Sequence, residues 1–196
     1  SNLRRQRQMC IRDSFKRASL LSRDSVHGPF DGTVRVDEEN TSLVVNGNAI
    51  KVIYASSPDE VKYAEHNIID PIVIDNTGVW RDEDSLSKHL KSGASKVILT
   101  APAKGDIKNI DFGINDDILN DNDAIISAAS CTTNAIVPVL KAINDEYSIE
   151  GGHIETVHAY TNDQNLIDNF HKGDRRGRGA PLNICLLYTS PSPRDR

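Results

Sequence analysis

Apolar and polar residues alternate between residues 33 and 54, and this period of two predicts short β-strands. The alternation is interrupted at Asn40 and at Asn46-Gly47-Asn48, where the residue types favour turns. The region is therefore expected to form short antiparallel strands joined by turns. The apolar positions of the pattern are Val34, Val36, Leu43, Val45, Ile50, Val52 and Tyr54.

After Ser57-Pro58 the pattern changes to short apolar runs separated by helical stretches. Residues 72–74 and 96–100 are typical of buried parallel strands. Between them, residues 82–91 have helical spacing and are followed by the stop signal Ser92-Gly93. Strand, helix and strand in this order predict a βαβ unit.

A second strand and helix are predicted further along the chain. Residues 124–129 form the strand, Ser130 stands where a helix N-cap belongs, and the helical segment ends at Gly151-Gly152. Residues 153–160 alternate again and predict another strand. Residues 162–179 are polar and rich in arginine, which predicts a loop.

The two ends of the chain follow neither period. Back-translated, residues 4–13 and 185–195 resemble the two arms of a transposase sequencing adapter, and the two arms are reverse complements of each other. We therefore expect residues 1–14 and 185–196 to be adapter-derived rather than native. The alternative is a basic N-terminal arm with a Pro/Ser-rich tail. If the ends are adapter-derived, residues 15–184 are a fragment of a longer protein. The 196-residue chain is then expected to lack activity and to aggregate, because apolar surface and a strand edge are left open.

Composition narrows the class of protein. The 196 residues carry a net charge of −5, which becomes more negative without the terminal segments and argues against a general nucleic-acid binder. No apolar run approaches the roughly 18 residues that span a bilayer. Cys131 is the one cysteine between residues 15 and 184, which fits a reducing compartment such as the cytoplasm. No Cys/His set has metal-ligand spacing.

The segment Ser130-Cys131-Thr132-Thr133-Asn134 lies between a predicted buried strand and a helix. A thiol at a helix N-terminus faces unpaired N–H groups and the positive end of the helix dipole, which favours the thiolate. The alternative is a small buried cysteine. A helix followed by a returning strand can bring His158 beside Cys131, which would supply a nucleophile and a base. The alternative is a hydrogen-bonded core histidine, as expected for His27, His66, His89, His153 and His171.

Four basic residues, Lys172, Arg175, Arg176 and Arg178, lie among glycines in the predicted loop. Guanidinium groups on such a loop suit phosphate recognition. A solvated charged loop is the simpler interpretation. A third hypothesis is a module that binds RNA or another polyanion through Lys172–Arg178, which the negative net charge disfavours.

Taken together, these motifs closely resemble the glyceraldehyde-3-phosphate dehydrogenase family, and the resemblance extends over essentially all of residues 15–184. Its most specific part is Ser-Cys-Thr-Thr-Asn followed by Thr-Val-His at this spacing. The matching stretches are DSVHGPFDG (24–32), NTGVW (76–80), LTAPAKG (99–105), ASCTTNAIVPVLK (129–141), ETVHAYTNDQ (155–164) and HKGDRRGRGAPLN (171–183).

The resemblance implies an α/β fold with two parts. Residues 15–130 would be the C-terminal part of an incomplete doubly wound, Rossmann-like NAD(P)-binding domain, and residues 131–184 the start of an α+β catalytic domain. The full-length protein would be a cytoplasmic homotetramer. It would oxidise glyceraldehyde 3-phosphate with inorganic phosphate to 1,3-bisphosphoglycerate. A sister enzyme acting on erythrose 4-phosphate is the alternative. NAD and NADP both remain open, because the acidic residue that would help to distinguish them, like the glycine-rich fingerprint before it, is missing from the sequence.

The resemblance also implies roles for individual residues. Cys131 would be the nucleophile and His158 the base. The expected substrate or phosphate contacts are Ser130, Thr132, Thr161, Asp163 and Arg176. The expected cofactor-lining residues are Thr77, Gly78 and Thr100. No metal and no membrane are expected.

Overall fold

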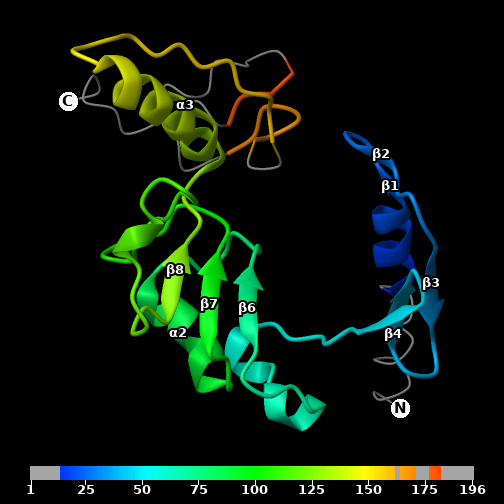
Figure 1. The fold of residues 1–196 in the computed structure, drawn as a ribbon. Coiled ribbons are helices and arrows are strands. Elements are labelled where there is room, and N and C mark those ends of the chain that lie inside the picture. Colours follow the sequence, from blue (N-terminus) through cyan, green and yellow to red (C-terminus); the bar gives the residue numbers. More distant parts are fainter. Residues whose placement is uncertain (1–13, 162–163, 171–176, 182–196) are drawn as a thin grey trace. The chain divides into compact units, whose positions relative to one another are not determined.

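The computed structural model describes residues 14–161, 164–170 and 177–181. The chain divides into two compact units, Ser1–Ala142 and Ile143–Arg196, which are treated separately below (Figure 1). The division between the two units falls inside the last helix that the structure describes. It does not test the domain boundary predicted between residues 130 and 131, which stays a prediction. The segments predicted to be adapter-derived lie, apart from Ser14, outside the described residues.

The first unit begins with helical residues 14–22 and a two-stranded hairpin, β1 (Arg23–Asp24) and β2 (Gly28–Pro29). The predicted antiparallel strands follow as β3 (Val34–Asp37), β4 (Ser42–Val45) and β5 (Asn48–Lys51). Asn46 and Gly47 join β4 to β5 with φ angles of 49° and 84°. Positive φ at both central residues suits the twist of a tight hairpin. The prediction is confirmed, although β5 ends at Lys51, before the apolar positions Val52 and Tyr54.

The predicted βαβ unit is also confirmed. It consists of β6 (Ile72–Asp75), α2 (Glu83–Lys91) and β7 (Lys96–Leu99), and β8 (Ile125–Ser127) extends the sheet in the order β6-β7-β8 with all pairs parallel. Asp82 caps α2 by accepting the Ser85 amide at 3.0 Å. Three 3-10 turns lie in the loops: η1 (Pro58–Glu60), η2 (Tyr63–His66) and η3 (Asp116–Ile118).

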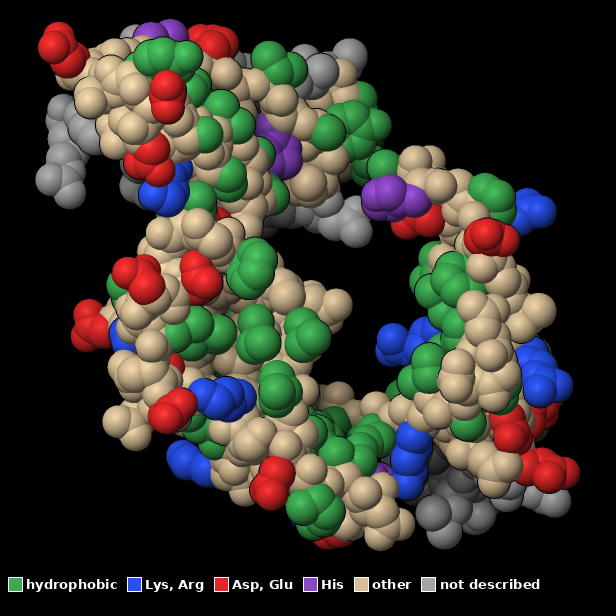
Figure 2. Space-filling model, in the orientation of Figure 1, with side chains coloured by type: hydrophobic (Ala, Val, Ile, Leu, Met, Phe, Trp, Pro, Cys, Tyr) green, Lys and Arg blue, Asp and Glu red, His purple; other side chains and the backbone are tan. Residues whose placement is uncertain are grey.

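The core of this unit lies between α2 and one face of the sheet. Leu86 packs with Val97, Leu99 and Ile107, and Trp80 and Leu90 border the cluster. On β6 the alternate positions Ile72 and Ile74 point to the opposite face, where they are 62% and 64% exposed. Hydrophobic side chains are accordingly visible at the surface over this sheet (Figure 2). Parallel sheets ordinarily bury both faces.

Helix α3 (Cys131–Tyr147) follows β8 and contains Pro138. Beyond it, one prediction is wrong: residues 153–160 form no strand. A strand needs a partner for its backbone N–H and C=O groups, and no strand pairs with these residues in the described parts of the chain. Val157 is 91% exposed, so its apolar side chain has no surface to pack against. The described residues of the predicted loop, 164–170 and 177–179, contain no helix or strand, as expected.

The structure confirms the α/β class by its parallel sheet and packed helix. Within the described residues, no helix combines the length and the apolar character needed to cross a bilayer.

Candidate active site

The carboxyl ends of the parallel strands lie at one edge of the sheet, because β6, β7 and β8 run in the same direction. These strands end at Asp75, Leu99 and Ser127. Open α/β sheets bind dinucleotides outside this edge. Six of the predicted site residues follow the three strand ends directly: Thr77, Gly78, Thr100, Ser130, Cys131 and Thr132.

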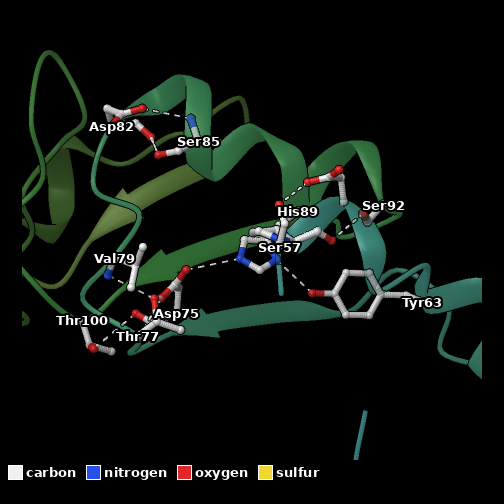
Figure 3. Close-up of polar contacts among 12 residues, drawn as sticks. Ser57, Tyr63, Asp75, Thr77, Val79, Asp82, Ser85, His89, Ser92 and Thr100 are labelled. Carbon is white, nitrogen blue, oxygen red and sulfur yellow. Dashed lines mark hydrogen bonds and ion pairs between the residues drawn. The ribbon is translucent and has the colours of Figure 1, made fainter. Parts of the chain in front are cut away.

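Asp75 links two of the predicted cofactor residues (Figure 3). Its Oδ1 accepts both the amide of Thr77, at 2.9 Å, and the Thr77 hydroxyl, at 2.7 Å. Its backbone carbonyl accepts the Thr100 amide at 3.0 Å and the Thr100 hydroxyl at 3.3 Å. The Thr77 Oγ1 in turn accepts the amide of Val79 at 3.2 Å. Thr77 and Thr100 are therefore positioned by one carboxyl-terminal strand residue.

Gly78 lies at the tip of this turn with φ at 72°. Apart from Gly78 itself and its two chain neighbours, no heavy atom lies within 4 Å of the position that a Cβ would take. Its backbone is thus uncovered, in a conformation that side-chain-bearing residues rarely adopt. Such a glycine allows a ligand to approach the main chain closely.

Ser130 is the N-cap of α3, as predicted. Its Oγ accepts the Thr133 amide at 2.9 Å and lies 2.7 Å from the Thr133 hydroxyl. The Ser130 carbonyl accepts the Asn134 amide at 2.9 Å, and the Asn134 side chain donates to the Ala128 carbonyl at 2.8 Å. The start of the helix is therefore fixed to the end of β8.

Ala129, directly before the cap, has a left-handed backbone with φ at 58° and is buried. This conformation is strained for a residue with a Cβ. The Ala129 amide donates to the Ser127 hydroxyl at 3.1 Å, and the Ala128 amide donates to the Leu99 carbonyl at 2.8 Å. The strained turn gives the chain its abrupt change of direction from β8 into α3.

Cys131 is the first residue of α3 and is exposed. Thr132 follows it and is half-buried. The exposed thiol at a capped helix N-terminus is in the environment that promotes cysteine reactivity, since the helix dipole favours a negative charge there. The position of Cys131 argues against the alternative of a small buried cysteine.

His158 and Thr161 belong to the second unit, whereas Cys131 belongs to the first. His158 is partly exposed, and its Nδ1 lies 2.5 Å from the carbonyl oxygen of Ala159. Thr161 is exposed. The strand that was expected to carry His158 is absent, so the pairing of His158 with Cys131 stays a prediction. Asp163 and Arg176 lie outside the described residues.

The described end of the arginine-rich loop is held by an ion pair. Arg178 Nη1 donates to Asp168 Oδ2 at 2.6 Å, and the Gly179 amide donates to Asp168 Oδ1 at 2.8 Å. The Gly179 amide, followed by Arg178, lowers the pKa of Asp168 below its ordinary value. Lys172, Arg175 and Arg176 lie outside the described residues, so the polyanion hypothesis stays a prediction.

One polar residue that supports the site has no recognisable signal in the sequence. Asp75 lies one position beyond the predicted strand 72–74 and was not singled out. His89 was expected to be a hydrogen-bonded core histidine, and it is buried with two polar partners. The same expectation is wrong for His27 and His153, which are exposed. Among the described residues, no group of three or more His, Cys, Asp or Glu could hold a metal ion.

Comparison with known families decides the relationship. Residues 9–83 match the family described as "Glyceraldehyde 3-phosphate dehydrogenase, NAD binding domain". Residues 130–191 match "Glyceraldehyde 3-phosphate dehydrogenase, C-terminal domain". The chain belongs to the glyceraldehyde-3-phosphate dehydrogenase family. The chain therefore contains part of an NAD-binding domain of Rossmann type, and the match to that domain includes β6.

Curated relatives support the same assignment. The chain is 62% identical over 178 residues to the glyceraldehyde-3-phosphate dehydrogenase-like protein of Pseudomonas aeruginosa strain UCBPP-PA14, covering 90% of this chain and 39% of that protein. It is 42% identical over 179 residues to glyceraldehyde-3-phosphate dehydrogenase of Thermotoga maritima, covering 91% of this chain and 53% of that protein. The Streptococcus pyogenes enzyme is 42% identical, with 85% of this chain and 49% of that protein covered. The chain thus spans about half the length of these relatives or less.

Proposed function

We propose that this chain carries part of the active site of an NAD(P)-dependent phosphorylating aldehyde dehydrogenase. The whole protein would oxidise glyceraldehyde 3-phosphate to 1,3-bisphosphoglycerate. One observation carries the proposal: Cys131 is an exposed thiol at the capped start of α3, directly beyond the carboxyl edge of a parallel sheet. The family matches of residues 9–83 and 130–191, which include Thr77 and Cys131 respectively, support it.

The residues after β6 and β7 fit a dinucleotide cofactor. Gly78 leaves its backbone uncovered, and the two threonines predicted to line the cofactor are held at the carboxyl edge by Asp75. Thr77, Gly78 and Thr100 would hold NAD or NADP. When bound, the nicotinamide supplies the hydride acceptor for the oxidation.

The protein's own residues would carry the covalent steps. The Cys131 thiolate attacks the aldehyde carbon to form a thiohemiacetal, while His158 supplies the proton to the former aldehyde oxygen. His158 takes that proton back as the same carbon is oxidised to a thioester on Cys131 Sγ. Inorganic phosphate then attacks the thioester carbon, the acyl phosphate leaves, and the thiolate is regenerated.

Substrate binding would involve the neighbouring hydroxyl groups and the second unit. Ser130 and Thr132 flank the thiol and would contact substrate or phosphate. Thr161, Asp163 and Arg176 would bind phosphate. The resemblance to the family leads us to propose that the full-length protein acts in the cytoplasm as a homotetramer.

Thiol reactivity tests the role of Cys131 in the chain as it exists. Cys10 and Cys185 serve as reference thiols on the same molecule. Limited alkylation with iodoacetamide at neutral pH, read by peptide mass spectrometry, should modify Cys131 about tenfold faster than the two references. Prior addition of glyceraldehyde 3-phosphate should slow the reaction at Cys131 and leave Cys10 and Cys185 unchanged.

Equal alkylation of all three thiols, with no protection by the aldehyde, would contradict the proposal. Erythrose 4-phosphate in place of glyceraldehyde 3-phosphate tests the sister activity. Stronger protection by erythrose 4-phosphate would favour that enzyme. In the full-length protein, Cys131→Ser should abolish phosphate-dependent NAD(P)H formation.

A further inference from the structure

A buried chain of hydrogen bonds runs from η2 through α2 to the end of β6 (Figure 3). The Tyr63 hydroxyl lies 3.0 Å from His89 Nδ1, and His89 Nε2 lies 3.3 Å from Asp75 Oδ2. Tyr63, His89 and Asp75 are 9%, 7% and 3% exposed. Three polar side chains from three separate elements therefore meet in the interior, with Asp75 at the end that faces the candidate cofactor site.

The two carboxylate oxygens of Asp75 have different partners. Oδ1 accepts both Thr77 donors, whereas Oδ2 faces the His89 ring. Rotation of the carboxylate would break the contacts on both sides together. The contact with His89 therefore fixes the orientation in which Oδ1 holds the turn of Thr77.

The hydrogen-bond roles follow from the chemistry of the three groups. An ionised carboxylate is an acceptor, so His89 Nε2 carries a hydrogen and donates to Asp75. In the neutral ring Nδ1 then accepts the hydroxyl hydrogen of Tyr63. Burial, followed by the charge of Asp75, raises the pKa of Tyr63 above its ordinary value. Tyr63 therefore keeps its hydrogen at neutral pH and locks the orientation of the His89 ring.

The turn that Asp75 holds is the one predicted to contact the cofactor. Thr77 Oγ1 accepts the Val79 amide, and this hydrogen bond holds the backbone on both sides of Gly78, the residue with the uncovered backbone. The same Asp75 residue fixes Thr100 through its carbonyl. Trp80, the only tryptophan of the chain, follows this turn and borders the core.

We propose that His89 is a positioning residue for cofactor binding: by orienting the Asp75 carboxylate it holds Thr77 and Gly78 in the arrangement that a dinucleotide contacts. Tyr63 assists by fixing the His89 ring. The inference rests on the proposed function, since it takes NAD(P) as the ligand of this edge. It adds two residues, remote in sequence from the thiol, to the set that determines cofactor affinity.

The test compares variants of the full chain by their affinity for NAD and NADP. Trp80 provides the readout, as quenching of its fluorescence on addition of the dinucleotide. His89→Leu removes the donor to Asp75 and leaves a buried carboxylate unpaired on that side, so it should weaken binding about tenfold or more. It should also shift the emission of Trp80 before any ligand is added.

Two further variants separate positioning from general stability. His89→Gln keeps a side-chain N–H that can reach Asp75 and should restore most of the affinity. Ser92→Ala is the matched control: it removes the 2.8 Å bond from Ser92 Oγ to the Pro58 carbonyl, one hydrogen bond at the same end of α2 that does not involve Asp75. This control should leave the affinity and the Trp80 spectrum unchanged.

Tyr63→Phe gives an independent test if His89→Leu does not fold. It removes only the hydroxyl, and it should weaken binding in the same direction by a smaller factor. Unchanged affinity in His89→Leu would overturn the inference. If only Tyr63→Phe folds, unchanged affinity in that variant would overturn it instead. In either case, binding by the wild-type chain would still support the cofactor site. Equal losses in Ser92→Ala would overturn it too. Absence of binding by the wild-type chain would count against the proposed cofactor site itself.

Discussion

The segment from β6 to β8 and the segment from residue 148 to 161 both have apolar patterns that predict strands, but only the first forms them. Residues 72–75 and 96–99 pair in register as parallel strands, and α2 covers them. Residues 153–160 have the alternation that also predicts a strand, yet they form none. The difference lies outside each segment: the first has a neighbouring strand and a helix to pack against, whereas the second has neither among the described residues.

The same contrast runs through the candidate site. Thr77, Thr100 and Ser130 are each held by hydrogen bonds that originate at the ends of paired strands or at the start of a helix. His158 contacts the carbonyl of the residue that follows it. Cys131, the predicted nucleophile, begins a helix that follows a paired strand. His158, the predicted base, lies on no strand. The chain therefore positions the nucleophile more firmly than the base.

The largest expected effect comes from comparing a leucine of the β6–β8 segment with a leucine of the predicted loop 162–179. Leu86 is 0% exposed and Leu166 is 74% exposed. Leu86→Ala should lower the free energy of unfolding by about 3 kcal/mol, because it leaves a cavity between α2 and the sheet. Leu166→Ala should change it by less than about 0.5 kcal/mol. Urea denaturation followed by Trp80 fluorescence measures both, and similar losses in the two variants would refute the contrast.

A smaller effect is expected at the start of α3. Ser130→Ala removes the acceptor of the Thr133 amide and should cost about 1 kcal/mol of stability. The freed helix end should also slow alkylation of Cys131, since the N-terminal turn that favours the thiolate becomes less ordered. Ser130→Thr keeps a capping oxygen and serves as the control. If Ser130→Ala alkylates as fast as wild type, the cap does not govern the thiol.

The smallest expected effect is a pH dependence that compares Asp82 with Asp168. Backbone amides, of Ser85 for Asp82 and of Gly179 for Asp168, are the main cause that lowers the pKa of each carboxyl. A lowered folded-state pKa means that each carboxylate contributes stability above its unfolded pKa, and that this contribution is lost as the pH falls through the lowered value. Stability should therefore decline on acidification in wild type.

The two substitutions to asparagine should separate the regions. Asp82→Asn keeps a capping acceptor on α2 but removes the titrating carboxyl group. The thermal unfolding midpoint should therefore fall less at low pH than it does in wild type. Asp168→Asn should leave that midpoint's pH profile as in wild type, because Asp168 belongs to the second unit and the core around β6–β8 belongs to the first. Equal changes in both profiles would show that the loop contributes to the same cooperative unit.

Local signals predicted much of the β6–α3 region. Ser130 before the last helix was recognisable as a cap, because a cap depends on residues three positions apart. The tight turn at Asn46-Gly47 was recognisable for the same reason. The pair of Asp75 and His89 was not, because the residues lie on different elements and meet only after α2 packs on the sheet.

The sequence by itself determined the α/β pattern, the position of the thiol at a helix start and the family motifs around it. These depend on periodicity and on contacts between near neighbours in the chain. The tertiary structure alone decided which apolar segments become strands, that Ala129 adopts a left-handed backbone, and that Tyr63, His89 and Asp75 join the core to the turn of Thr77. Those features require partners distant in sequence, which a linear pattern does not specify.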